Sequence, residues 1–347
     1  MNESPPLSKK PFFLNTNAVR TALVYCIAAA ALCWVFHDVN FGSLKKEFFN
    51  IVWPLAILGM VVDVGRYITQ SIRWNLLLRP FGKISVFKTF QALYAGIFLN
   101  LILPLRVGEV ARAYLASRFA NARFPSVVSS MFVEYLFDII WLAVGIGAIA
   151  LVVPLPGDVM LAARILGVVV LAAVALFVFL LFFRTSDKPA AAAGPVSRPG
   201  RFAGSIVSFL DTIRKGFQVI GRTGRFWISL FVSAFDIVFH IVAFWILMHA
   251  YGIHLPLIVA AAILLFIFVG LIIPNAPSNV GSFQFLCVLG LLAFGVDKTT
   301  AGGFSVFFFV IVNIPQVVIG WLAFMKSGEK LNEIRTHIAS LRLSNRE

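Results

Sequence analysis

Three charged residues with the chemistry of a phosphate-binding site follow an apolar segment that ends at Pro104. Arg106, Glu109 and Arg112 are spaced by three positions, which places their side chains on one face of a helix. A guanidinium matches the oxygens of a phosphate, and Glu109 could hold one guanidinium while the other stays free. We therefore expect a phosphate-binding site here. The alternative is an ordinary charged cytoplasmic loop.

Two further pairs of charged residues interrupt apolar segments at helical spacing. Glu134 and Asp138 are four positions apart and would repel each other, so we expect a nearby arginine or the uptake of a proton. Asp63 and Arg66 are three positions apart and could pair with each other. Because ionisable groups within a membrane usually face a cavity or a partner, both pairs are candidates for function, and a purely structural ion pair is the alternative.

For two more pairs, both a functional role and a purely structural or interfacial role stay open. Asp236 and His240 repeat the spacing of four in the second part of the chain, where a single histidine is more often structural. Arg73 and Trp74 could belong to a binding site, or they could lie at the membrane interface with the arginine reaching toward water.

A second polar segment contains only uncharged candidates, which are Asn275, Asn279, Ser282 and Gln284. The sequence contains no nucleotide-binding loop, zinc-ligand spacing, nucleophile elbow or glycine-rich phosphate fingerprint. We therefore expect no cofactor and no metal. The three cysteines lie in apolar stretches without metal or redox spacing, so we interpret them as apolar residues.

The elements that must position these residues are membrane helices. The chain has 347 residues, of which 60% are hydrophobic and 13% are charged, whereas soluble domains carry about 25% charged residues. The mean hydropathy is +0.93. The apolar blocks are long enough to cross a bilayer, which needs roughly 20 helical residues. The net charge is +14, and the basic residues lie between these blocks. This position favours a role in orienting the protein in the membrane and in contacting anionic headgroups over nucleic-acid binding.

The sequence predicts an all-α integral membrane protein with about six full transmembrane helices and two oppositely oriented re-entrant hairpins. The expected helices are 19–36, 51–76, 124–152, 159–183, 226–250 and 303–325. The first expected hairpin is 89–118, because a full crossing there would place strongly basic loops on the wrong side. The second is 257–296, because its second arm, 283–296, is only about 21 Å long as a helix and the membrane core is about 30 Å thick. The expected cytoplasmic parts are the tail 1–18, which we do not read as a cleaved signal peptide, the basic linker with an amphipathic helix 184–225, and the tail 326–347.

The two hairpins predict an internal inverted repeat between a first half, 19–183, and a second half, 226–325. The first hairpin contains Phe98-Leu-Asn-Leu-Ile-Leu-Pro104, and the second contains Phe268-Val-Gly-Leu-Ile-Ile-Pro274. A Val-Gly pair follows each proline. Chance similarity between apolar segments is the alternative. Inverted repeats with broken helices near the midplane are typical of transporters that work by alternating access.

The first hairpin and its surroundings resemble a known family. The pattern consists of Arg73-Trp74 and of Asn100-Leu-Ile-Leu-Pro104-Leu-Arg106-Val-Gly108-Glu109-Val-Ala-Arg112. It resembles the transmembrane region of lysylphosphatidylglycerol synthases, a family that includes stand-alone flippase-like proteins and hopanoid-associated relatives. The resemblance extends from about residue 20 to 325. The second family motif, P-x-x-P-G-G-x-G with a following acidic residue, departs here to Pro274-Asn-Ala-Pro277-Ser278-Asn279-Val280-Gly281 with Gln284.

The resemblance implies movement of a lipid between leaflets of a bacterial inner membrane. The lipid would have an anionic or zwitterionic headgroup, as in a phospholipid, a hopanoid or a polyprenyl-phosphate lipid, and a lipid-biosynthesis protein could be a partner. Synthases of the family carry an aminoacyl-transfer domain after the membrane region. Because this chain stops about 22 residues after its last expected helix, we expect it not to make lysylphosphatidylglycerol.

Two alternatives stay open, which are a membrane-embedded enzyme that modifies a lipid and an accessory subunit that transports nothing. The enzyme would need a nucleophile or general base near Arg106, Glu109 and Arg112, for which Glu134 and Asp138 are the candidate pair. The residues that we expect to bind the substrate are Arg66, Arg73, Asn100, Pro104, Arg106, Glu109, Arg112, Glu134, Asp138, Asp236, His240, Asn275, Asn279, Ser282 and Gln284.

Overall fold

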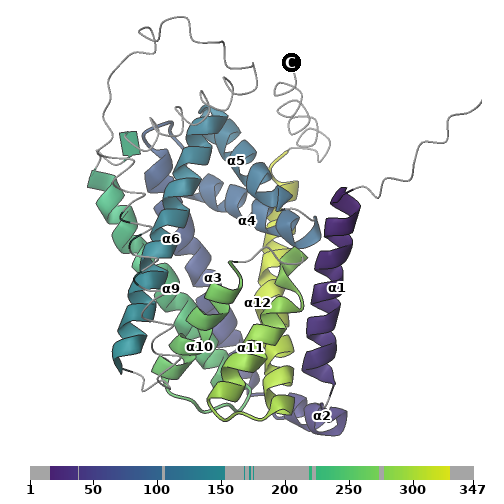
Figure 1. Ribbon diagram of the computed structural model, residues 1–347. Coiled ribbons are helices and arrows are strands. Elements are labelled where there is room, and N and C mark those ends of the chain that lie inside the picture. The colour runs from purple at the N-terminus through teal and green to yellow at the C-terminus, as the bar shows by residue number, and fades with distance from the viewer. Residues whose placement is uncertain are drawn as a thin grey trace, which may run out of the picture.

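A computed structural model describes residues 16–37, 39–103, 106–152, 168, 172, 175, 219–220, 224–272 and 277–328. All regular secondary structure in these described ranges is helical. The expected helix 159–183, the linker 184–225 and both tails lie largely or wholly outside them. Figure 1 shows the described helices as a bundle, in which long helices run between two opposite ends.

Four helices of the described part are long and apolar enough to cross a membrane. They are α3 (Trp53–Leu78), α6 (Phe124–Val152), α9 (Gly224–Ala250) and α12 (Lys298–Met325). Each coincides with an expected transmembrane helix. The main difference is that α12 begins five residues early, because Asp297 caps it by accepting hydrogen bonds from the backbone N–H groups of Thr299 and Thr300. The expected helix 19–36 corresponds to α1 (Thr16–Phe36).

Two shorter helices occupy the position of the first expected hairpin. They are α4 (Val86–Ile102) and α5 (Val107–Ala120), with a break between them. The two helices pack closely because glycines face each other: a Cβ added to Gly108 would lie 1.9 Å from the backbone oxygen of Gly96. No larger residue fits there without a shift of the backbone. Figure 1 shows this pair at one end of the bundle, which we call the α5 end.

The second expected hairpin contains α10 (Leu257–Gly270), the short 3₁₀ turn η2 (Pro277–Asn279) and α11 (Ser282–Ala293). In Figure 1 this pair lies toward the opposite end of the bundle, where α2 (Phe41–Phe49), a helix that the sequence pattern did not predict, packs against α12. We call this the α2 end. The breaks in the two pairs meet inside the bundle, where the hydroxyl of Ser278 donates a hydrogen bond of 3.1 Å to the backbone oxygen of Leu101.

The helices α3 and α9 lie antiparallel along their length. At the α2 end, the backbone N–H of Val52 donates to the oxygen of Ala250 over 2.9 Å. Toward the α5 end, the hydroxyl of Ser229 donates to the backbone oxygen of Arg73 over 3.4 Å. Gly59 lets α3 approach the side chain of Leu247 between these points. This central pair carries charged residues from both parts of the chain.

The apolar core has two main parts. One surrounds the phenylalanines of α9 and α12, where the ring of Phe244 contacts those of Phe304 and Phe308 at 5.4 and 5.0 Å. The other joins α3, α4, α5 and α6 around the fully buried Trp74. This second part of the core lies against Arg112, whose guanidinium stacks on Trp74.

Candidate functional site

The centre of the candidate site is an ion-pair network around Arg73. Its guanidinium lies 2.6 Å from Asp138 and 3.3 Å from Glu134, both on α6. The Arg73 side chain is 1% exposed, Glu134 is 2% exposed and Asp138 is 45% exposed. The expected arginine beside Glu134 and Asp138 is therefore present. It reaches both carboxylates from α3, a helix that ends far from α6 in the sequence.

Arg112 completes the network from α5. Its guanidinium pairs with the second carboxylate oxygen of Glu134 and stacks 3.9 Å from the ring of Trp74. The indole N–H of Trp74 donates to the hydroxyl of Ser130 over 3.0 Å. The alternative in which the Arg73 side chain reaches toward water beside Trp74 is wrong, because both side chains are fully buried among the helices. They belong to the packed centre of the α3, α5 and α6 contact.

Glu109 has other partners than the sequence suggested. Its carboxylate accepts hydrogen bonds from the side-chain amide of Asn100 at 3.2 Å and from the hydroxyl of Tyr135 at 2.8 Å. Our expectation that Glu109 holds one of the two neighbouring guanidinium groups is wrong, because Glu134 holds Arg112 instead. The Asn100–Glu109 bond ties the end of α4 to the start of α5.

Arg106 is the exposed cation of the site. It precedes α5 with a left-handed backbone (φ 53°), a conformation that is unfavourable for a residue that carries a Cβ atom. Its side chain forms no ion pair with any residue in the described ranges. That this guanidinium binds a phosphate stays a prediction from the sequence.

A second group of charges lies further along the α3–α9 pair. Asp63 and Arg66 form the expected pair over 3.3 Å, and the guanidinium of Arg66 stacks 4.0 Å from the ring of Tyr67. Asp236 on α9 is within electrostatic range of both Arg66 and Arg73. One oxygen of Asp236 is buried without a hydrogen-bond partner in the described part of the chain. His240 packs its ring 4.9 Å from that of Phe268.

The polar residues of the second hairpin play different parts. Asn279 and Ser278 both have left-handed backbones (φ 56° and 57°), as Arg106 does at the corresponding break of the first hairpin. The side-chain oxygen of Gln284 accepts a hydrogen bond of 2.7 Å from the N–H of Gly281, which makes Gln284 a cap of α11. Ser282 is the first residue of α11. The candidates Pro104 and Asn275 lie outside the described residues.

The sequence analysis did not identify the roles of three residues in the site. Trp74 stacks against Arg112, Ser130 accepts the hydrogen bond from Trp74, and Tyr135 donates a hydrogen bond to Glu109. Tyr135 adjoins Glu134, but the pattern of apolar residues does not distinguish it from other interfacial aromatics. Ser130 lies one helical turn before Glu134, on the same side of α6. This spacing is the one signal that could have identified it.

Taken together, the charged residues of the Arg73 network and of the second group of charges include one carboxylate more than guanidinium groups, and one of the carboxylates, Asp138, is exposed. Three guanidinium groups, of Arg66, Arg73 and Arg112, face four carboxylates, of Asp63, Glu134, Asp138 and Asp236. Within the described residues, no group of three or more histidine, cysteine, aspartate or glutamate side chains could hold a metal ion. The arrangement can bind a phosphate at Arg106 and a positively charged group at the carboxylates.

Comparison with known proteins gives a family and two relatives. Residues 18–320 match the family described as lysylphosphatidylglycerol synthase TM region. A UPF0104 membrane protein of Methanocaldococcus jannaschii is 22% identical over 324 residues, which cover 88% of this chain and 94% of that protein. The glycosyltransferase AglD of Haloferax volcanii is 26% identical over 152 residues, which cover 42% of this chain and 23% of AglD. The match therefore spans less than a quarter of AglD.

Proposed function

Because the chain belongs to the lysylphosphatidylglycerol synthase transmembrane-region family, we propose that this multi-pass membrane protein moves a polar-headgroup lipid between leaflets. The headgroup would pass along the charged residues between the two hairpins while its acyl chains stay in the bilayer. This role is more specific than the family assignment, which indicates only a lipid-related membrane region. It also explains why charged residues, which are energetically unfavourable in a membrane, lie between the two hairpins.

The observation that carries the proposal is the position of Asp138. It is the middle residue of α6, 14 positions from Phe124 and 14 from Val152. Each half of the helix is about 21 Å long, so the carboxylate lies near the middle of the membrane if α6 crosses it. Asp138 is nevertheless 45% exposed. A charged group exposed at that depth needs water or a polar ligand, which supports a wet path beside α6.

The arrangement of the helices supports alternating access. Each half contains a long helix, a pair of short helices and a second long helix, and the leading helices α3 and α9 are antiparallel. We propose that the halves form an inverted repeat with two re-entrant hairpins whose breaks meet at Leu101 and Ser278. Rocking of one half against the other would then open the path to either side.

The distribution of exposed charges supports a cytoplasmic position for the α5 end. The described cations at that end, apart from the site itself, are Arg79, Lys83, Lys88, Arg118, Arg123, Arg225 and Lys326, with no carboxylate among them. The α2 end carries Lys45, Lys46 and Lys298 together with Glu47 and Asp297. By the positive-inside rule, we propose that the α5 end faces the cytoplasm.

The charge balance favours a zwitterionic headgroup over a purely anionic one. Arg106 offers a guanidinium for the phosphate, whereas the two groups of charged residues on α3, α5, α6 and α9 include one carboxylate more than guanidinium groups when the exposed Asp138 is counted. An amine on the headgroup would compensate the excess negative charge near Asp138 and Asp236. A lipid that combines a phosphate with an amine therefore matches both parts of the site.

A lipid-modifying enzyme has less support from the same residues. Both oxygens of Glu134 are bound by arginines, so this carboxylate is not free to act as a base. Asp138 alone remains of the expected catalytic pair. The named glycosyltransferase relative matches only part of this chain, so its activity does not transfer.

The test is translocation of headgroup-labelled lipids by the purified chain in liposomes. We expect wild type to move a zwitterionic phospholipid faster than an anionic one, and Asp138→Asn to reduce this rate at least roughly tenfold, equivalent to about 1.4 kcal/mol in the barrier. Asp297→Asn makes the same chemical change at the α2 end and should leave the rate unchanged. Absence of movement by wild type contradicts the proposal. Chemical turnover of the lipid would favour an enzyme, and movement only after addition of a partner would favour an accessory subunit.

A further inference from the structure

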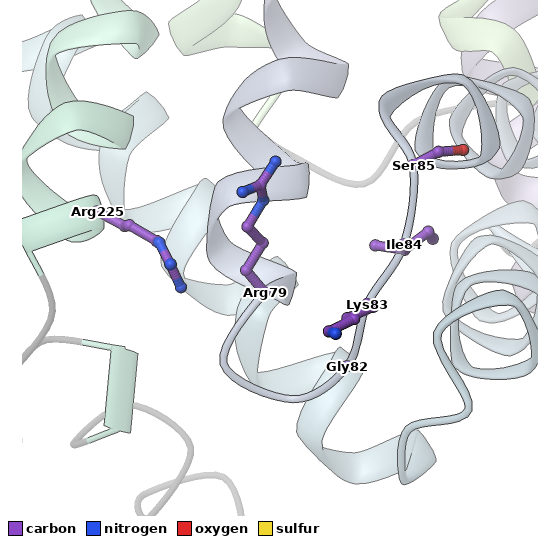
Figure 2. A pocket seen from close by; sticks show the side chains of 6 residues that line it. All are labelled: Arg79, Gly82, Lys83, Ile84, Ser85 and Arg225. Carbon is purple, nitrogen blue, oxygen red and sulfur yellow. The ribbon is translucent and has the colours of Figure 1, made fainter.

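A second polar feature lies at the surface of the α5 end, apart from the charged network. A pocket of about 520 Å³ is lined by Arg79, Gly82, Lys83, Ile84, Ser85 and Arg225. Figure 2 shows that its cationic side chains come from two regions of the chain, since Arg79 and Lys83 follow α3 whereas Arg225 begins α9. The lining contains three cations and no carboxylate.

The loop that forms the pocket is held in place by its neighbours. The side-chain amide of Asn75 donates a hydrogen bond of 2.8 Å to the backbone oxygen of Ile84. Gly82 lies so close to α5 that an added Cβ would be 2.2 Å from the backbone oxygen of Ala120. These two contacts fix the backbone between Arg79 and Lys83, so the cationic side chains extend from a loop that its neighbours hold in place.

The three cations have no anionic partner in the described part of the chain. Arg79, Lys83 and Arg225 are exposed and form no ion pair with a described residue. Arg79 donates one hydrogen bond to the side-chain oxygen of Asn75 at 3.4 Å. Three like charges around one concave space repel each other unless an anion or water separates them. A phosphate, with its several oxygens, could contact all three together.

The position of the pocket along the helices identifies the source of the phosphate. Arg79 follows the last residue of α3, and Arg225 is the second residue of α9, so both lie where membrane helices end. Trp227, two positions after Arg225, is 67% exposed, as expected for an aromatic side chain at headgroup level. Basic pockets between membrane helices on the cytoplasmic side commonly bind anionic lipid headgroups.

We propose that this basic pocket binds the phosphate of an anionic phospholipid from the leaflet at the α5 end. The site is separate from the translocation path, because Arg79 lies six positions beyond Arg73, about 9 Å along the helix. Lipid binding in this pocket does not require that the protein translocates lipids. It would join the loop after α3 to the start of α9 and stabilise their contact.

The test measures binding of phosphatidylglycerol to the purified full-length chain in neutral detergent by native mass spectrometry. The pocket variant is Arg79→Gln, Lys83→Gln and Arg225→Gln. The control variant is Lys88→Gln, Arg123→Gln and Lys326→Gln, which removes three exposed cations from the same end outside the pocket. We expect the pocket variant to bind at least roughly tenfold more weakly than wild type, and the control to change by less than about threefold.

Further probes distinguish the two sources of phosphate. Glycerophosphoglycerol, which is the headgroup without acyl chains, and inorganic phosphate should each bind at least roughly tenfold more weakly than the intact lipid. Equal losses in the pocket and control variants would overturn the pocket as a specific site. Equal affinity for inorganic phosphate and lipid would overturn a lipid ligand. Matching unfolding temperatures of the two variants would show that a loss of binding is not a loss of folding.

Discussion

The guanidinium of Arg73 on α3 lies 2.6 Å from the carboxylate of Asp138 on α6, and the two side chains differ sharply in exposure. Arg73 is fully enclosed, whereas Asp138 reaches open space at the centre of its helix. A buried cation thus holds a carboxylate that is itself exposed. The pair separates a structural role, carried by Arg73, from a proposed contact with a ligand, carried by Asp138.

Removal of Arg73 should destabilise the protein strongly. Arg73→Gln leaves Glu134, which is 2% exposed, with one cationic partner and Asp138 with none. We expect a loss of about 3–5 kcal/mol in the free energy of unfolding, as is usual when one partner of a buried ion pair is removed. Chemical unfolding in detergent measures it. Arg79→Gln, which changes an exposed arginine of the same helix end, should cost less than about 0.5 kcal/mol. Similar small losses in both variants would contradict the structural role of Arg73.

The close contact of α4 and α5 should not tolerate a methyl group. Gly108→Ala would place its Cβ 1.9 Å from the oxygen of Gly96 and 2.5 Å from the side-chain oxygen of Asn100. We expect a loss of about 1–3 kcal/mol in unfolding free energy, since the hairpin must open to fit the extra atom. Gly147→Ala on α6 is the matched control, because no atom lies within 4 Å of the added Cβ. An unchanged unfolding temperature for Gly108→Ala would show that the two helices are not packed in this way.

The cap of α12 should make stability depend on pH in the acid range. Partial burial of Asp297 disfavours its charge, but the hydrogen bonds from Thr300 and Thr299 outweigh this effect and lower its pKa below the ordinary 3.8. A carboxylate with a lower pKa in the folded state stabilises the fold at pH values above its unfolded pKa. That contribution is lost as the pH falls through the folded pKa.

Two substitutions at Asp297 distinguish the effect of the capping hydrogen bonds from the effect of the negative charge. Asp297→Ala should cost about 1 kcal/mol at neutral pH, whereas Asp297→Asn keeps a capping side chain and should lose only the smaller contribution of the charge. The difference in unfolding free energy between wild type and Asp297→Asn should shrink as the pH is lowered below about 4. A constant difference across this range would contradict the ionised cap.

Much of the fold was predictable because membrane helices leave simple signals. Runs of apolar residues indicated α3, α6, α9 and α12, and the prolines at the ends of two shorter runs indicated the breaks near Leu101 and Ser278. The helix α2 was not predictable in this way. It forms around Asn40, which caps it, and Glu47, which accepts hydrogen bonds from Tyr251 and Thr300. Those two partners come from distant parts of the chain.

The site was predictable in its members more than in its pairings. Spacing alone indicated Arg106, Arg112, Glu134 and Asp138, because charges within apolar runs are rare. The pairing of Arg112 with Glu134 rather than with Glu109 depends on how α5 packs on α6. Spacing within one helix cannot reveal a contact between two helices. The stacking of Arg112 on Trp74 was hidden for the same reason.

The backbone at Arg106 allows its charge and its conformation to be tested apart. Glycine adopts the left-handed conformation (φ 53°) without the strain that other residues carry. We expect Arg106→Gly to be more stable than Arg106→Ala by about 1 kcal/mol, because only the alanine keeps the strain. Unfolding of the two variants under identical conditions measures this difference. Equal stabilities would contradict a left-handed backbone at the break between α4 and α5.

The most direct test of the translocation path compares the rate of lipid movement in liposomes among wild type, Arg106→Lys, Arg106→Gly and Arg106→Ala. If the guanidinium receives the headgroup phosphate, Arg106→Gly and Arg106→Ala should both lose translocation despite their different stabilities. Arg106→Lys should keep part of the rate, since lysine retains the charge but not the planar fork. Translocation at the wild-type rate by folded and inserted Arg106→Ala would contradict the path that we propose.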